Sequence, residues 1–235
     1  IIQGATEFLP VSSSGHLVIL HKMFPDMVLD DLAFDTILHL ATLVALLWFF
    51  RSEVFKMLIA WFKSLGGKHD NDSRLAWLIL IGILPALLVG YYFADVIEDI
   101  FHSIYWVTAM LIIVGILFIV FEKIYNRNNH SLDQLTWKNA LAVGLAQVLA
   151  FIPGTSRSGI TIIAGLANGL KREAAVKYSF LMSIPLVAAA GLSQIDVLLR
   201  GGFNKDDATI YVISFISAVV SGYLSVKYFL RFSEK

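Results

Sequence analysis

Four long stretches without a charged residue most strongly constrain how this chain can fold. They are Leu75–Ala94, Ile104–Phe121, Tyr178–Ile195 and Ala208–Val226. A helix needs about 20 predominantly apolar residues to cross the hydrocarbon core of a bilayer. Only 15% of the 235 residues are charged and 57% are hydrophobic, whereas soluble domains average about a quarter charged. The sequence therefore predicts an all-α, polytopic membrane protein that forms one transmembrane domain over residues 1–235.

Charge and cysteine content exclude several classes of protein. The formal net charge is +0 at pH 7, so the chain lacks the basic surface of a nucleic-acid-binding protein, and we expect no nucleic-acid partner. The absence of cysteine excludes disulfides and thiolate metal sites. No basic region precedes the first apolar run, so no signal peptide is expected.

Lysine and arginine are distributed unevenly between the two predicted sides of the membrane. Cytoplasmic loops retain these residues, so their positions predict orientation. The larger group on one side consists of Arg51, Lys56, Lys63, Lys68, Arg74, Lys123, Arg127, Lys138, Lys171, Arg172, Lys177, Lys227, Arg231 and Lys235, and the smaller group of Lys22, Arg200 and Lys205. This distribution is consistent only if the segments near 1–20 and 139–170 return to the side from which they enter. Both segments are therefore predicted to be re-entrant helix-loop-helix hairpins.

Each predicted hairpin contains a break rich in proline, glycine and serine. Residues 8–16 read FLPVSSSGH, and residues 151–159 read FIPGTSRSG. Proline removes a backbone donor and ends a helix. Irregular backbone at membrane depth persists only where protein or a water-filled cavity covers it. We therefore expect the two breaks to line a cavity.

The two breaks also match each other when Pro10 is aligned with Pro153. Each hairpin precedes a spanning helix, a polar or basic loop and a longer helix, which predicts an inverted-topology repeat of about residues 1–95 and 138–232. A helix over residues 104–122 would connect the halves. Such repeats place their site near the midplane, where broken helix ends present N–H groups to anions. The alternative is that two glycine- and serine-rich stretches agree by chance.

Ionisable side chains accompany both breaks. Gln3 and Glu7 lie four residues apart, on one helical face that points toward the serines 12–14 and His16, and the other break carries Arg157. An ionisable group at membrane depth costs about 2.5–3.5 kcal/mol, so each needs a partner or a use. Glu7 and Arg157 could form a purely structural ion pair, but such a pair requires neither the histidine nor the hydroxyls.

This combination of residues matches phosphate chemistry. The planar fork of Arg157 suits two phosphate oxygens, and N–H groups in glycine- and serine-rich turns form anion-binding nests. Ser13 or His16 could act as the nucleophile, with Glu7 or His16 as the base, and the residues themselves do not decide between them. The expected substrate-binding residues are Ser12, Ser14, Gly154, Thr155, Ser156, Ser158 and Gly159.

Two further polar residues lie on the helix predicted over residues 33–50. His39 is expected to be a packed group or to form a hydrogen bond between helices. Asp35, near the outer end, is expected to cap the helix or to face the cavity. We place Asp35 beside the site and not among the residues that touch the substrate.

At these residues the chain resembles the undecaprenyl-diphosphate phosphatase family, integral membrane enzymes associated with bacitracin resistance. The family's glutamate motif is similar to Gln3–Glu7, with glutamine in its first place, and its Pro-Gly-x-Ser-Arg-Ser-Gly motif is similar to Pro153–Gly159. Gln147 belongs to the resemblance and is expected to support the site. Family members carry a few more residues before Gln3 and usually one further helix, so a fragment is expected here. The other matching positions are residues 10–16, 34–40 and 179–181.

The resemblance implies hydrolysis of undecaprenyl (polyprenyl) diphosphate to the monophosphate, which recycles the lipid carrier for cell-wall synthesis. It also implies a divalent cation, Mg²⁺ or Ca²⁺. By position, Gln3 and Glu7 would assist the metal or the water, Arg157 would grip the diphosphate, and Ser13 or His16 would attack. The protein would lie among the lipids of the cytoplasmic membrane, with its cleft open to the outer face. Whether the protein forms a homodimer is left open.

Other functions share parts of this pattern. Type-2 phosphatidic acid phosphatases also use Ser-Gly-His and Ser-Arg motifs, but they need a histidine where Ile163 stands and an Arg-Pro pair that this sequence lacks. Broken helices in inverted repeats are typical of secondary transporters, so a carrier or flippase of a phosphorylated lipid or small anion is the main alternative. A folded but inactive homologue is a third interpretation.

Overall fold

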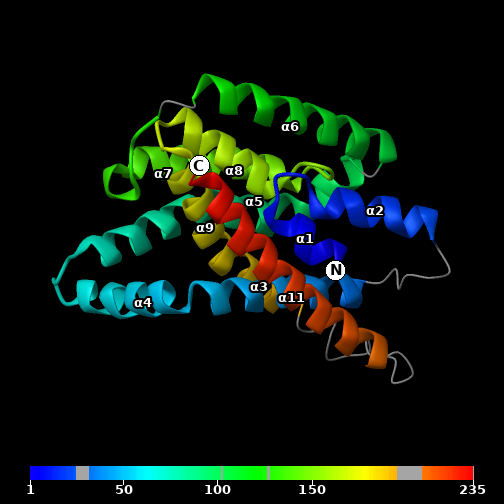
Figure 1. The fold of residues 1–235 in the computed structure, drawn as a ribbon, viewed down its shortest axis with the longest axis horizontal. Helices are drawn as coiled ribbons and strands as arrows, with labels where there is room; N and C mark the ends of the chain where they lie inside the picture. The colour runs from blue at the N-terminus through cyan, green and yellow to red at the C-terminus, as the bar shows by residue number, and fades with distance from the viewer. Residues whose placement is uncertain (25–31, 102, 126–127, 195–207, 235) are drawn as a thin grey trace.

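The computed structural model describes residues 1–24, 32–101, 103–125, 128–194 and 208–234. These residues form a helical structure, drawn in Figure 1. Arg127, Arg200, Lys205 and Lys235, which entered the charge distribution, lie outside the described residues. The helices, in chain order, are α1 (Ile2–Phe8), α2 (Ser13–Met23), α3 (Leu32–Phe49), α4 (Arg51–Leu65), α5 (Asn71–Phe101), α6 (Ile104–Ile124), η1 (Leu132–Gln134), α7 (Trp137–Gln147), η2 (Val148–Phe151), α8 (Arg157–Ala167), α9 (Arg172–Ser193) and α11 (Ala208–Ser233).

Four of the described helices are long and apolar enough to cross a membrane, by length and composition. They are the Asn71–Phe93 part of α5 and the helices α6, α9 and α11, so the four predicted apolar spans are confirmed as helices. α3 and α4 pass the same test only as a pair, and they are bent by 83° relative to each other. This pair is either one broken span or a re-entrant element, whereas the sequence predicted a spanning helix over residues 33–50 followed by a polar or basic loop.

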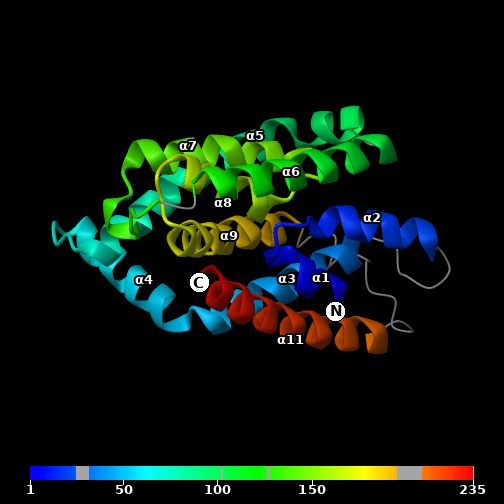
Figure 2. The ribbon, with the colours of Figure 1, turned by 45° about the horizontal axis from the view of Figure 1, so that its top comes forward.

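α9 is the central helix of the fold. It contacts α8, α5, α3 and α11, and Figure 2 shows it between the group α5–α8 and the group α3, α4 and α11. Half of the apolar window of α9 is buried, against 11% for α6 at the edge of the molecule. Its side chains Tyr178, Phe180 and Met182 are almost fully buried in the main apolar core. Polar groups beside the buried half of α9 are therefore surrounded by protein.

One predicted boundary is wrong. The sequence predicted the end of this span near residue 94 and a loop over 95–103, but α5 continues to Phe101. Acidic residues end the apolar stretch, yet neither glycine nor proline occurs between Gly90 and Ser103. Charge ends a hydrophobic segment without ending a helix, because acidic residues are tolerated on a helix in water. The next helix begins only where the Ser103 side chain accepts a hydrogen bond from the backbone N–H of Tyr105.

Both predicted breaks are present. The chain leaves α1 at Leu9, which is extended, and re-enters a helix at Ser13. In the second half, α7 continues into the short 3-10 helix η2 and α8 begins at Arg157. α1 packs on α2, α3 and α11, and α8 packs on α6, α7 and α9. The two breaks therefore reach the same region from different sides of the fold.

Candidate functional site

The first break positions Ser13 beside α1. Ser12 caps α2 by accepting a hydrogen bond from the backbone N–H of Gly15, and its backbone has φ 63° and ψ 100°. A positive φ at a residue other than glycine costs on the order of 1–3 kcal/mol and persists only when its surroundings hold it. The sharp turn starts α2 next to the helix that precedes it. The Ser13 hydroxyl consequently donates a hydrogen bond of 2.5 Å to Oε2 of Glu7.

The second break places Arg157 at the first turn of α8. Gly154 has φ +89°, and a Cβ there would lie 2.4 Å from the carbonyl oxygen of Val107, so this turn requires glycine. Ser156 caps α8 by accepting a hydrogen bond of 3.1 Å from the backbone N–H of Gly159. The guanidinium of Arg157 thus lies where a helix N-terminus already favours anions.

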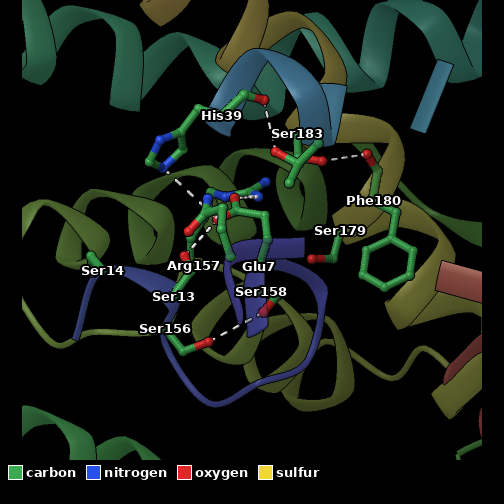
Figure 3. Close-up of polar contacts among 12 residues, drawn as sticks. Glu7, Ser13, Ser14, His39, Ser156, Arg157, Ser158, Ser179, Phe180 and Ser183 are labelled. Carbon is green, nitrogen blue, oxygen red and sulfur yellow. Dashed lines mark hydrogen bonds and ion pairs between the residues drawn. The ribbon is translucent and has the colours of Figure 1, made fainter. Parts of the chain in front are cut away.

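The two breaks are joined directly by two hydrogen bonds. The Ser158 hydroxyl donates to the carbonyl oxygen of Leu9 over 3.0 Å, and Nη2 of Arg157 donates to Oε1 of Glu7 over 2.7 Å. Figure 3 shows Glu7 between Arg157 and Ser13, with His39 on the far side of the carboxylate. Residues that are 150 positions apart therefore meet in one site, as the sequence predicted for residues 7 and 157.

The Glu7 carboxylate is buried, with 8% of the residue exposed. Three side chains donate to it: Arg157 to Oε1, and Ser13 and Gln3 to Oε2, the last over 3.0 Å. A buried carboxylate needs such partners because its desolvation is costly. The arrangement keeps a charged acceptor within hydrogen-bonding reach of a serine hydroxyl, which is the geometry of a base beside a nucleophile.

His39 belongs to this site, although the sequence pattern did not assign it there. Its Nε2 lies 3.9 Å from Oε2 of Glu7, and its Nδ1 lies 2.8 Å from the backbone oxygen of Asp35. A carbonyl oxygen can only accept, so Nδ1 carries the proton and Nε2 faces the carboxylate. Its spacing of four residues from Asp35 on an otherwise apolar helix was the available signal, but nothing in the sequence showed that this face meets α1.

These residues line a cavity of about 260 Å³ between the two breaks, α3, α5 and α9. A larger cavity of about 330 Å³ lies between α4, α5 and α9, and its lining side chains carry no ionisable group. We assign the chemistry to the smaller cavity, which contains the carboxylate, the guanidinium and the hydroxyls. Its lining residues are Glu7, Ser12, Ser13, Ser14, His39, Ala86, Gln147, Ala150, Phe151, Thr155, Ser156, Arg157, Leu186, Val187 and Ala190.

Six residues singled out from the sequence are not among the lining residues: Gln3, His16, Asp35, Gly154, Ser158 and Gly159. The Nδ1 atom of His16 lies 2.7 Å from the backbone oxygen of Ser12, so this ring is held against its own helix turn. Asp35 contributes its backbone oxygen to His39. The catalytic role of His16 stays a prediction.

Three other polar side chains are buried around the cavity with unused hydrogen-bonding atoms in the described part of the chain. Gln147 and Thr155 line the cavity, and neither the Gln147 amide nor the Thr155 hydroxyl has a hydrogen-bond partner there. Oε1 of Gln3 also has no hydrogen-bond partner among the described residues. Buried polar atoms are normally paired. These atoms are therefore available to a bound polar ligand or to water after small rotations.

The donor set fits a divalent cation only in part. Within the described residues no group of three histidine, cysteine, aspartate or glutamate side chains could hold a metal ion, and Glu7 is the one carboxylate among the lining residues. Mg²⁺ is often held by one or two carboxylates together with substrate phosphates and water. The site therefore suits a cation whose other ligands come from a bound diphosphate, with the free oxygen of Gln3 close to Glu7.

Comparison with known proteins gives one consistent result. The family model described as bacitracin resistance protein BacA matches residues 1–235. An undecaprenyl-diphosphatase of Rubrobacter xylanophilus is 42% identical, over 98% of this chain and 86% of its own length. Undecaprenyl-diphosphatase 2 of Stutzerimonas stutzeri is 43% identical and the Thermomicrobium roseum enzyme 40% identical, each over 100% of this chain and 87% of the relative.

Proposed function

Because this chain belongs to the BacA family of bacitracin resistance proteins, we infer that it is an undecaprenyl-diphosphatase, a multi-pass membrane enzyme. It hydrolyses undecaprenyl diphosphate to undecaprenyl phosphate and inorganic phosphate, the reaction for which its relatives are named. The observation that carries the proposal in this structure is the contact of Ser13 and Arg157 with one buried carboxylate, Glu7. This contact supplies a nucleophile, a base and a phosphate-binding cation in one cavity.

In the proposed first step, Ser13 attacks the terminal phosphorus of the diphosphate. Glu7 takes the hydroxyl proton through the 2.5 Å hydrogen bond, the new Oγ–P bond forms, and the bond from phosphorus to the bridging oxygen breaks. Polyprenyl monophosphate leaves. Water then attacks the phosphorus of the phosphoserine and the Oγ–P bond breaks. The Ser13 oxygen regains the proton held by Glu7, and the protons of the water leave on inorganic phosphate. The geometry favours Ser13, which lines the cavity and contacts Glu7, over His16, which is not among the lining residues.

Arg157 and the two helix N-termini stabilise negative charge in this proposal. One Arg157 nitrogen donates to Glu7, and a guanidinium has five N–H donors, so others are available to phosphate oxygens. Donors fixed before the reaction lower the barrier because they need not reorganise as charge develops.

We propose that a divalent cation, Mg²⁺ or Ca²⁺, takes part, with Glu7 and Gln3 as the residues that would hold it. When bound, it would neutralise charge on the diphosphate oxygens. The chain's own part is to offer a buried carboxylate oxygen and an amide oxygen on one helical face. Gln147 and Thr155, with unused polar atoms beside the cavity, would bind the remaining phosphate oxygens.

We also propose that the two helix-break-helix segments are re-entrant hairpins of an inverted repeat in the cytoplasmic membrane. The basic loops would lie on the cytoplasmic side and the cavity would open to the outer face. The uneven distribution of lysine and arginine and the meeting of the breaks at Ser158 and Leu9 support this arrangement. Cysteine scanning of the loops with an impermeant thiol reagent tests the orientation.

Phosphate release by reconstituted protein separates the enzyme from a carrier. Purified protein in liposomes should release inorganic phosphate from undecaprenyl diphosphate, and Arg157→Ala and Glu7→Ala should abolish the release. Movement of unhydrolysed lipid between leaflets without phosphate formation would instead support the transporter alternative.

A further inference from the structure

The cavity has two chemically different walls. One carries the carboxylate, guanidinium and hydroxyls described above, and the other is formed by apolar side chains of α5, η2 and α9. Three alanines stand in this apolar wall: Ala86, Ala150 and Ala190. Ala86 is 1% exposed, whereas Ala190 is exposed. The wall therefore runs from the interior of the protein to its surface.

The apolar wall is kept open by small side chains and by the placement of one ring. Phe151 also lines the cavity, and its ring packs into the space over Gly90 of α5, where a Cβ would lie 2.8 Å from the Phe151 Cζ atom. Gly90 therefore accepts the ring against α5. With the ring held there and alanine on each of the three elements, the space beside the phosphate-binding groups can take carbon atoms.

This chemistry selects the group attached to the diphosphate. A ribose or another sugar next to the diphosphate would place hydroxyls against alanine, leucine and valine side chains, and unpaired hydroxyls are costly to bury. A branched hydrocarbon unit would bury its methyl groups there without that cost. The phosphate groups alone would need no apolar wall.

We propose that Ala86, Ala150 and Ala190 bind the isoprene unit next to the diphosphate and so determine specificity for prenyl over nucleoside diphosphates. The inference rests on the proposed function and adds residues that select the substrate at the same site. Because the wall contacts only the first unit, it does not distinguish short from long prenyl chains. The three alanines are specificity-determining residues and take no part in the chemical step.

The test replaces Ala190 by leucine, with Ala189→Leu as the matched control. Ala189 is the neighbouring, partly exposed alanine of α9 and is not among the cavity-lining residues. In Ala190→Leu we expect KM for farnesyl and undecaprenyl diphosphate to rise by similar factors of about tenfold, the effect of misplaced methylene groups in a hydrophobic pocket. We expect kcat to change much less, and Ala189→Leu to behave as wild type. Ala150→Leu provides a second variant should Ala190→Leu unfold.

Three results would overturn the proposal: equal KM changes in Ala190→Leu and Ala189→Leu, a change confined to the long-chain substrate, or wild-type hydrolysis of uridine diphosphate as fast as that of farnesyl diphosphate. Failure of the proposed function gives a different result, since wild-type protein would then release no phosphate from either prenyl diphosphate. In that case equilibrium binding of farnesyl diphosphate to the same variants still decides whether the alanine wall binds prenyl groups.

Discussion

Replacing Arg157 by lysine separates the charge of this residue from its shape. Arg157 donates to Glu7 over 2.7 Å, and its side chain is 16% exposed. Lysine keeps the positive charge, so the buried carboxylate keeps a cationic partner. Removing the charge altogether, as in Arg157→Ala, would leave that carboxylate unpaired and cost about 3–5 kcal/mol of stability. Arg157→Lys should therefore lose much less stability than Arg157→Ala.

The activity of Arg157→Lys should fall steeply all the same. A point charge cannot hold Glu7 and two phosphate oxygens in the fixed geometry of a guanidinium. Each lost hydrogen bond to a charged group is worth about 1.5–3 kcal/mol, which corresponds to roughly tenfold to a hundredfold in rate. With one or two such bonds lost, we expect kcat/KM to fall by at least about tenfold and up to about ten-thousandfold.

The assay is phosphate release in detergent micelles, run beside thermal unfolding of the same preparations. Arg172→Lys is the matched control, because Arg172 also pairs with a glutamate, Glu122 at 2.8 Å, but lies away from the cavity. It should keep wild-type turnover. Near-normal kcat/KM in Arg157→Lys, or a loss of activity fully explained by unfolding, would refute the role given to the guanidinium.

The same geometry leads to three further predictions. Ser13→Ala should abolish both turnover and the trapping of a labelled phospho-enzyme, whereas His16→Ala should still form the labelled phospho-enzyme. Label retained in Ser13→Ala would mean that another residue is the nucleophile. Gly154→Ala should lower the melting temperature and the activity together, because its φ of +89° and the 2.4 Å between the Val107 oxygen and a Cβ at this position leave no room for a side chain; an unchanged melting curve would contradict this. A chelator should stop phosphate release, and Mg²⁺ or Ca²⁺ should restore it, because the single positive charge of Arg157, which is already paired with Glu7, cannot balance a diphosphate. Equal rates with and without chelator would show that no cation takes part.

Much of the fold could be predicted because membrane insertion constrains sequence strongly. A long uncharged stretch has few alternatives to a helix in lipid, and the four such stretches are helical here. The breaks were predictable from composition, since Pro10 and Pro153 are each followed by several serine and glycine residues. Proline alone is not sufficient, because Pro85 and Pro185 lie within α5 and α9. The end of α5 at Phe101 was not predictable. The acidic residues after the apolar stretch end the hydrophobic segment, but they do not stop the backbone from continuing as a helix.

The pairing of Glu7 with Arg157 was predictable, and the contacts of the two histidines were less so. Glu7 and Arg157 stand out because charge at membrane depth needs a partner, and the structure pairs them. His39 does not stand out, because a histidine on an apolar helix is compatible with packing as well as with a site. Its place near Glu7 depends on how α3 packs against α1, and a periodic pattern within one helix does not encode its rotation relative to another. The same limit applies to His16, whose ring turns back to its own backbone.

The pairing of Glu7 with Arg157 across 150 residues also bears on how the protein is made. A ribosome has to synthesise most of the chain before the guanidinium exists, so the early carboxylate has no arginine partner while the intervening helices are being inserted. Until then α1 and the break after it lack the hydrogen bonds that join them to α8, so their final packing waits for the second half. Formation of the Glu7–Arg157 pair is thus a late event in biogenesis, and a chain halted before α8 would lack this pair.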